Sequence, residues 1–307
     1  MIKEEKIIAD WSADMYEIDE TGTEDVEFLL SCLGAEPKHI LEIACGSGRI
    51  LVPLAKAGHT VVGLDMDEAM LRKIPAKAEG LDNIAWRMAD AIVEDWETDY
   101  DVVVIAGNFL MNIVSEEGPE RAQQILLEKA KFALKPGGML YIDYNHTFYP
   151  EQWYVHPGER VIWEGTDSQG ITGRMLLCDS TYDAATGLIR SVRRYELETA
   201  TGEKIRKEMP SVKHYVSLEQ IHTWLSEAGF RIEKEYGDYA GNPIGEATVR
   251  VIICAVPDNF TRFGEVMPDG RLTVPSDGKT YRMREAINLS KKLGRPLTEE
   301  EMKKFEI

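Results

Sequence analysis

The residues best suited to bind a ligand lie in the run Ile40-Leu-Glu-Ile-Ala-Cys-Gly-Ser-Gly-Arg-Ile50, in which an apolar strand pattern meets two glycines. Glycine lets the backbone adopt angles that other residues avoid, and it lets a ligand approach the main chain closely. A plain strand-to-helix turn would also use Gly46 and Gly48. A dinucleotide-binding turn would need a third glycine where the sequence has Leu51, so a pyrophosphate at this helix N-terminus is disfavoured. Glu42, just before the turn, favours a ligand with an ammonium group.

Two further acidic residues follow the next two predicted strands. Asp65 lies 19 residues after Gly46, where a carboxylate can accept hydrogen bonds from both hydroxyls of a ribose. Asp90 follows the third strand, where it could accept from the amino group of an adenine. Each has an ordinary alternative, because Asp65, like Asp67, could cap the following helix and Asp90 could be a loop acid. Since the carboxyl ends of parallel strands meet at one crevice, we expect the three loops to form a single site.

The elements that must position these residues alternate between strands and helices. After two helices in the first 35 residues, the pattern predicts strands at 39–44, 60–64, 83–87, 101–106 and 139–144, and helices at 49–56, 68–74 and 119–134. In this prediction Pro75 ends the second of these helices, and Lys-Pro-Gly-Gly at 135–138 closes the third. Such alternation implies right-handed crossovers and a parallel sheet that is covered on both faces.

The pattern changes beyond residue 150. Over 160–216, segments rich in Thr, Tyr, Val, Ile and Arg are separated by polar turns, which predicts an antiparallel meander of three or four strands. A helix at 218–228, with Ser217 as its N-cap, and strands at 231–236 and 248–256 follow.

The last 50 residues form a turn-rich tail for which we expect two helices, one near 283–293 and one that begins near Thr298. The apolar stripe of the first tail helix predicts that it packs on the rest of the protein or on a second subunit. There it would be a stabilising brace, or a lid that brings Tyr281 or Arg282 to the site.

Composition excludes several classes of protein. The chain has 307 residues, with 35 Lys+Arg against 53 Asp+Glu, and its net charge of −18 disfavours a nucleic-acid partner. An apolar fraction of 44% is ordinary for a soluble globule, and no apolar run approaches the roughly 20 residues that cross a bilayer. The four cysteines lie far apart without a Cys-x-x-Cys motif, which disfavours a zinc ribbon and fits a reducing compartment. We therefore expect a cytoplasmic protein with no metal and no membrane partner.

Three runs together resemble the class I S-adenosylmethionine-dependent methyltransferases. They are Leu41 to Arg49, Gly63-Leu-Asp-Met-Asp-Glu-Ala-Met-Leu71 and Leu134-Lys-Pro-Gly-Gly-Met-Leu-Tyr-Ile-Asp143. The resemblance covers about residues 10–256. It implies an α/β fold with a Rossmann-like seven-stranded sheet, mostly parallel with the last strand antiparallel, an antiparallel β insertion after the fifth strand, and a helical C-terminal tail. The expected domains are a methyltransferase domain at 1–257, which includes the insertion at 151–216, and an extension at 258–307.

The resemblance also implies the cofactor S-adenosyl-L-methionine, with S-adenosyl-L-homocysteine as product. Carried over by motif, the residues expected to bind the donor are Glu42, Ala44, Gly46 and Gly48 for the methionine part, Asp65 and Met66 for the ribose, and Asp90 and Ala91 for the adenine, with Gly107 beside them.

Catalytic candidates lie at the ends of the fourth and fifth strands. The run Ala106-Gly-Asn-Phe-Leu-Met-Asn112 is similar to the Gly-Asn-Ser-Phe stretch of glycine and sarcosine N-methyltransferases, although it lacks the serine. Asn108 is a candidate there, and a polar end to a buried strand is its alternative. The strand end at Tyr144, Asn145 and His146 brings a hydroxyl, an amide and an imidazole to the same sheet edge. His146 could be a general base, or a capping or structural histidine.

The meander resembles insertions in small-molecule N-methyltransferases, including those that act on amino sugars. We expect its aromatic and basic residues to line an acceptor pocket or a homodimer interface. These residues are Trp153, Tyr154, Trp163, Arg174, Tyr182, Arg193, Arg194 and Tyr195. Because side chains alternate along a strand, about half of them should face water or the sheet core.

The expected function is in-line transfer of a methyl group to nitrogen or oxygen of a small-molecule acceptor. The donor is already activated, so positioning and exclusion of water can suffice without a catalytic triad or a metal. The alternative is a regulatory or scaffold protein that binds S-adenosylmethionine without turnover and has no reason to keep an open, polar acceptor pocket. A nicotinamide-dependent oxidoreductase is disfavoured by Leu51.

Overall fold

The computed structural model describes residues 3–113 and 115–258, and in the tail residues 272–274, 279–281, 289, 301 and 303–305. The chain divides into two compact units, Met1–Val256 and Pro257–Ile307. The residues expected to bind the donor belong to the first unit, and so do the aromatic and basic residues expected around the acceptor.

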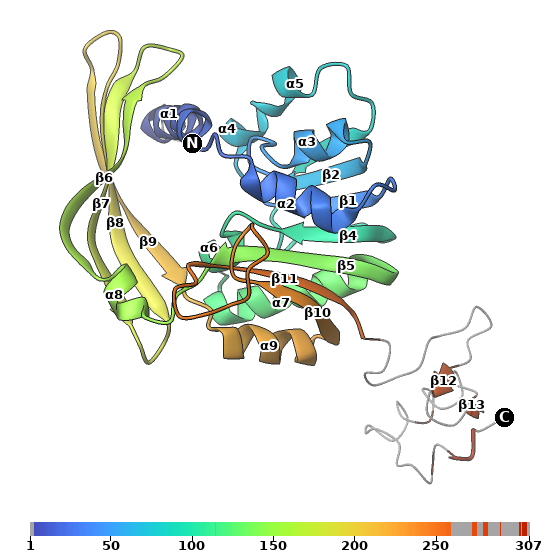
Figure 1. Cartoon of the computed structure of the whole chain (residues 1–307). Helices are drawn as coiled ribbons and strands as arrows, with labels where there is room; N and C mark the ends of the chain where they lie inside the picture. Colours follow the sequence, from blue (N-terminus) through green and yellow to red (C-terminus); the bar gives the residue numbers. More distant parts are fainter. Residues whose placement is uncertain are drawn as a thin grey trace. The chain divides into compact units, whose positions relative to one another are not determined.

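The first unit is built on a seven-stranded sheet with the strand order β10-β11-β5-β4-β1-β2-β3 (Figure 1). Its strands are β1 (His39–Ile43), β2 (Thr60–Asp65), β3 (Ile84–Met88), β4 (Tyr100–Ile105), β5 (Leu134–Asn145), β10 (Phe230–Tyr236) and β11 (Arg250–Pro257). Strands β1 to β5 pair in parallel, and β11 is antiparallel to β5. This topology confirms the predicted Rossmann-like sheet.

Both faces of the sheet are covered, as the continuous apolar pattern of β4 predicts. Val103 and Ile105 pack in a cluster with α7 (Pro119–Ala133) and α9 (Leu218–Glu227). Val102 and Val104 point the other way and pack with α2 (Glu24–Leu33) and α3 (Leu51–Lys56). Ser217 caps α9 as expected, with a reciprocal bond to Gln220. The two helical layers hold the carboxyl ends of β1, β2 and β4 in place.

Two predicted boundaries are wrong. The helix expected at 68–74 is two short helices, α4 (Glu68–Leu71) and α5 (Ile74–Lys77), and Pro75 lies in the first turn of α5, where a missing N–H does no harm. Strand β5 begins at Leu134 rather than at residue 139, because Leu134 already pairs with Tyr100 before the register shifts. The short helices α6 (Phe109–Asn112) and α8 (Pro150–Tyr154) were not predicted.

A four-stranded antiparallel sheet follows β5 and confirms the predicted meander. Its strands β6 (His156–Thr166), β7 (Thr172–Asp183), β8 (Leu188–Glu198) and β9 (Lys204–His214) pair in sequence order. Figure 1 shows the meander standing beside the main sheet, with the N-terminal helix α1 (Lys3–Asp19) between its outer end and the helices α4 and α5. Ile8, Trp11 and Met15 of α1 are buried together with side chains of the meander.

In the second unit, β12 (Leu272–Val274) pairs antiparallel with β13 (Lys279–Tyr281), two strands that the sequence did not predict. The helix expected at 283–293 lies outside the described residues except for Leu289, which is helical. The final helix is likewise described only in part, and Arg282 and the side chain of Tyr281 lie outside the description. Among the helices in the described part of the chain, none is long and apolar enough to cross a membrane.

Candidate functional site

The turn between β1 and α3 has the left-handed backbone that its glycines suggest. Gly46 and Gly48 have φ angles of 54° and 79°, and Ala44 has a φ of 59°. In a residue other than glycine, this conformation costs roughly 1–2 kcal/mol. The turn also lies against β2, since a Cβ on Gly63 would be 2.6 Å from the sulfur of Cys45. The main chain of this turn thus has a fixed conformation and packs closely against β2.

Asp65 ties the turn to the end of β2. Its Oδ2 accepts a hydrogen bond from the Gly46 N–H at 2.7 Å, and its Oδ1 accepts one from the Asp67 N–H at 2.7 Å. The helix α4 is capped by Asp67, whose side chain accepts from the N–H groups of Ala69 and Met70. The capping role therefore belongs to Asp67. Burial raises the pKa of the Asp65 carboxyl.

Glu42 lies in the core of the site and is only 3% exposed. Its Oε2 has no hydrogen-bond partner among the described residues. Burial raises the pKa of Glu42 to about 8, although the nearby Arg49 guanidinium opposes the shift. Arg49 itself is paired with both carboxylate oxygens of Asp25, at 2.9 and 2.6 Å. A buried acid without a partner can become charged when a cation reaches it.

Two methionines and a turn lie at the ends of β2 and β3. Met66 is 69% exposed and Met88 is 63% exposed, although large apolar side chains are usually covered. Asp90 accepts hydrogen bonds from the N–H groups of Ile92 and Val93, at 2.8 and 3.3 Å, so it shapes this loop. Ala91, the next residue, is buried.

The ends of β4 and β5 are fastened to each other by Asn108. Gly107 and Asn108 both have a left-handed backbone, with φ angles of 63° and 67°. The Oδ1 of Asn108 accepts a hydrogen bond from the Asn145 N–H at 2.6 Å. Asn108 therefore positions the last residue of β5, whatever else it contacts.

Tyr144 and His146 are buried in the protein interior and do not face an open site. Tyr144 is fully buried, and burial raises the pKa of its hydroxyl. The Nδ1 of His146 lies 3.2 Å from the Tyr215 hydroxyl, which donates its proton to the Thr147 carbonyl. The proton of the imidazole is therefore on Nδ1, and Nε2 has no partner among the described residues. Burial lowers the pKa of His146 to about 4, so the ring is neutral at physiological pH.

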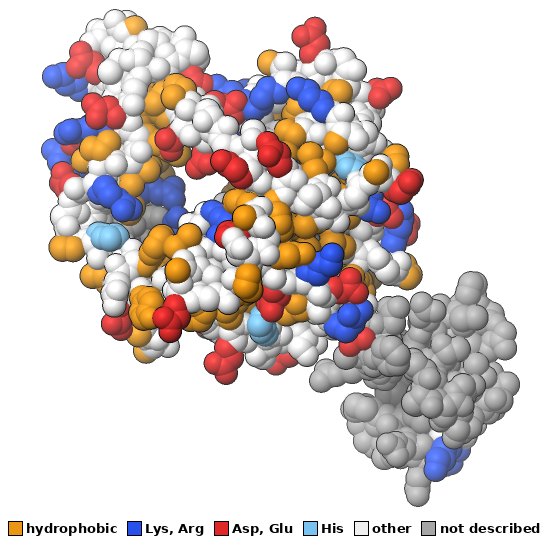
Figure 2. All heavy atoms as spheres, in the orientation of Figure 1, with side chains coloured by type: hydrophobic (Ala, Val, Ile, Leu, Met, Phe, Trp, Pro, Cys, Tyr) orange, Lys and Arg blue, Asp and Glu red, His pale blue; other side chains and the backbone are white. Residues whose placement is uncertain are grey.

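A cavity of about 660 Å³ lies between the end of β5, the helix α8 and the inner face of the meander. Figure 2 shows a hollow between the meander and the main body, with Lys and Arg side chains gathered on the meander side. Of the predicted residues, Trp153, Tyr154, Trp163 and Arg193 line the cavity. Tyr195 instead packs with α1, and the ring of Tyr182 packs in tilted and edge-on contacts against Tyr154 and Tyr215. Arg174 and Arg194 pair with glutamates on the outer face.

Among the lining residues outside the predicted catalytic and pocket sets are three polar ones, Asn145, Arg160 and Lys213. Asn145 lines the cavity at the end of β5, because side chains alternate along the strand and Tyr144 faces the core. Arg160 and Lys213 also line it. The alternation of Ile189, Ser191 and Arg193 along β8 could have identified the inner face, but the register that adds Arg160 and Lys213 is a property of the folded sheet.

The donor side and the meander are connected by a second, smaller space and by α1. A cavity of about 270 Å³ is lined by Tyr16, Asp67 and Met70 on one side and shares Trp163 and Arg193 with the larger cavity.

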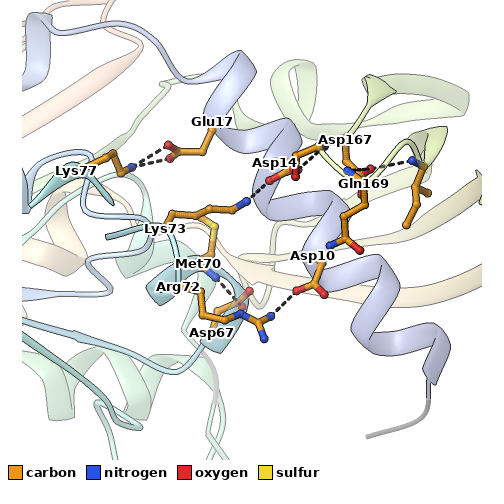
Figure 3. Close-up of polar contacts among 12 residues, drawn as sticks. Asp10, Asp14, Glu17, Asp67, Met70, Arg72, Lys73, Lys77, Asp167 and Gln169 are labelled. Carbon is orange, nitrogen blue, oxygen red and sulfur yellow. Dashed lines mark hydrogen bonds and ion pairs between the residues drawn. The ribbon is translucent and has the colours of Figure 1, made fainter. Parts of the chain in front are cut away.

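Acidic side chains of α1 contact the α4–α5 region, and one of them also contacts the meander (Figure 3). Asp14 contacts Lys73 of the loop before α5 and the N–H and hydroxyl of Ser168 in the meander. Asp10 pairs with Arg72, and Glu17 with Lys77 at 2.8 Å. The helix α1 thus connects the meander to the α4–α5 region of the main body.

Known proteins resemble this chain in sequence and in fold. A family model described as a methyltransferase domain matches residues 40–138, which contain the turn, Asp65, Asp90 and Asn108. This match identifies the chain as an S-adenosylmethionine-dependent methyltransferase. The donor of this methyltransferase is therefore S-adenosylmethionine.

Relatives and solved structures agree with this assignment. A putative methyltransferase of Geobacillus sp. (strain WCH70) is 26% identical over 71% of this chain and 84% of its own length. Glycine N-methyltransferase of Rattus norvegicus is 24% identical over 52% of this chain, and the match covers 59% of the rat protein. The CcbJ methyltransferase of Streptomyces caelestis, at 20% identity, shares the fold with a TM-score of 0.61 over 80% of this chain and 96% of its own.

Proposed function

We propose that this methyltransferase transfers a methyl group to a nitrogen or oxygen of a small molecule that is bound under the meander. The observation that carries the proposal is the cavity of about 660 Å³ at the end of β5. Its volume is typical of small-molecule sites, and its wall combines aromatic rings with polar groups. A regulatory protein that only binds the donor would have no need of such a space.

On the donor side, we propose that Glu42 binds the ammonium group and that the backbone at Ala44, Gly46 and Gly48 borders the methionine part. Asp65 would accept from the ribose hydroxyls. Met66 would lie beside the ribose with Asp65, while Asp90 and Ala91 would border the adenine, and Gly107 would lie near the transferred group. The unpartnered buried oxygen of Glu42 and the exposed side chain of Met66 support this placement.

On the acceptor side, this chain has to align the acceptor and exclude water, because the sulfonium of S-adenosylmethionine supplies an activated methyl group. Asn108 holds Asn145 at the cavity wall. The buried positions of Tyr144 and His146 favour a supporting role, in which His146 holds Tyr215 and the turn at Thr147.

Two further observations bear on the acceptor atom and on the role of the meander. The rat relative is named as an N-methyltransferase, which favours nitrogen as the acceptor atom, although the chain spans only 59% of that relative. The meander is better suited to cover the acceptor than to form a dimer core. Its inner face lines the cavity, whereas its outer face bears ion pairs such as Arg174–Glu196 and Arg194–Glu208.

The test compares two neighbouring aspartates by calorimetry with S-adenosylhomocysteine. Asp65→Ala removes the proposed ribose acceptor and should weaken binding by about 1.5–3 kcal/mol, or roughly 10- to 150-fold. Asp67→Ala removes only the cap of α4, so it should lower the unfolding free energy by about 1 kcal/mol and leave the affinity nearly unchanged. Equal affinities in wild type and Asp65→Ala would remove Asp65 from the donor site.

A second measurement identifies the acceptor class. The protein is incubated with labelled donor and a cell extract, and the products are analysed by mass spectrometry. Label in a low-mass fraction is expected. Label confined to protein or nucleic acid would contradict a small-molecule acceptor.

A further inference from the structure

Three cationic side chains share the wall of the large cavity. Arg160 of β6, Arg193 of β8 and Lys213 of β9 all line it. Arg160 and Arg193 both pair with Leu177 in the register of the meander, so they lie on the same face on either side of that residue. Lys213 pairs with Ile189, which is on the same face as Arg193.

These cations differ from those on the outer face of the same sheet. Arg174, Arg194 and Arg206 each form an ion pair with a glutamate. Arg160, Arg193 and Lys213 have no ion pair or side-chain hydrogen bond to any described residue, and no described Asp or Glu lines the cavity. In a chain with a net charge of −18, a sheet that pairs its outer arginines and leaves its inner cations unpaired concentrates positive charge at one place.

Lys213 also differs from the outer arginines in its burial. Lys213 is largely covered, and burial, reinforced by the charge of Arg193, lowers its pKa to about 8. A lysine held in this way gains an electrostatic partner only when an anion enters the cavity.

We infer that the acceptor carries a group with two negative charges, and that Arg160, Arg193 and Lys213 bind this group while the reacting atom lies towards Asn145. The inference rests on the proposed function and narrows its substrate class. A phosphate ester and a pair of carboxylates have the same charge, and both suit the planar donors of arginine. Arg193 also lines the smaller cavity near Asp67, so the anion-binding wall is continuous with the donor side.

The experiment measures binding of inorganic phosphate, succinate and acetate to the full chain by calorimetry, with and without saturating S-adenosylhomocysteine. Phosphate or succinate should bind in competition with each other and more tightly than acetate. Arg193→Gln and Lys213→Gln should each weaken the binding of the dianion at least about tenfold, because each removes a charged hydrogen-bond donor. The matched control is Arg194→Gln, the next residue on β8, whose side chain pairs with Glu208 on the outer face and should not affect binding.

The outcomes separate this inference from the proposed function. Lys213→Gln should keep wild-type affinity for S-adenosylhomocysteine, which also shows that the variant is folded. If the wild type binds S-adenosylhomocysteine but neither dianion, or if Arg194→Gln weakens dianion binding as much as Arg193→Gln, the inference is wrong and the proposed function stands. Equal affinity for acetate and for the dianions would also overturn the inference. If the wild type does not bind S-adenosylhomocysteine, the proposed function itself fails.

Discussion

Glu42 is the residue whose chemistry should change most when the donor binds. Its pKa is raised to about 8 by burial, so at pH 7 the carboxyl is mostly protonated in the free protein. An ammonium group in contact with it would favour the charged form and bring its pKa well below 7. Binding should therefore release close to one proton per donor molecule at pH 7. The release should vanish above about pH 9, where Glu42 is already ionised.

Calorimetry in buffers with different heats of ionisation measures this release directly. Glu42→Gln removes the titrating group, so it should bind S-adenosylhomocysteine more weakly and without proton release. Arg49 also lies near Glu42, and its guanidinium keeps its proton throughout this pH range. The same release in Glu42→Gln as in the wild type would assign the proton to another group and contradict the ammonium contact.

At the scale of single residues, the sequence predicts a contact correctly where residue type and strand order alone determine it. Asp65 and Gly46 lie far apart in the chain but are hydrogen-bonded, as expected for loops at the ends of adjacent parallel strands. The sequence does not predict which face of the sheet a given side chain of a strand occupies. Tyr144 faces the core and Asn145 faces the cavity, because a shift by one residue along a strand exchanges the two faces.

At the scale of elements, α1 connects the meander to the α4–α5 region, two parts of the fold that are formed by distant segments of the chain. Asp14 contacts Lys73 on one side and Ser168 on the other, and both members of the Asp14–Lys73 pair are largely covered. We expect a double-mutant cycle with Asp14→Ala and Lys73→Ala to give a coupling energy of about 1 kcal/mol at low salt. About 1 M NaCl should reduce the coupling, since the Debye length there is only ~3 Å.

The matched control is the exposed pair Glu117–Arg121 on the flank of α7, whose charged atoms are 3.8 Å apart. Its coupling energy should be close to zero at every salt concentration. If both cycles give the same small value, α1 is held by its apolar face and not by its charges.

The elements themselves were largely predictable. The strands of the main sheet and the meander follow from apolar runs bounded by polar turns, because burial on both faces requires such runs. The two-part helix around Pro75 and the early start of β5 at Leu134 depend on tertiary pairing, which local patterns do not contain. The strands β12 and β13 are only three residues each, too short for a periodic pattern to show.

At the scale of the whole molecule, two electrostatic effects oppose each other. The net charge of −18 repels an approaching anion from afar, whereas the three cations of the cavity attract it at close range. Between about 0.01 and 0.1 M salt the Debye length falls from ~30 to ~10 Å, which screens the distant charges first. We therefore expect phosphate affinity to rise several-fold over this range and to fall at higher salt. A steady decrease from the lowest salt would show that the net charge has no influence on binding.

The position of α1 also sets the order in which the protein can be completed during synthesis. Glu5 pairs with Lys207 of β9, 202 positions further along the chain, and Trp11 is covered by the meander. At the roughly 5–20 residues per second of a ribosome, the first helix waits about 10–40 s for the strands that cover it. Throughout that time the meander that buries Ile8, Trp11 and Met15 is incomplete. We expect a chaperone to bind α1 on the nascent chain before the meander covers it.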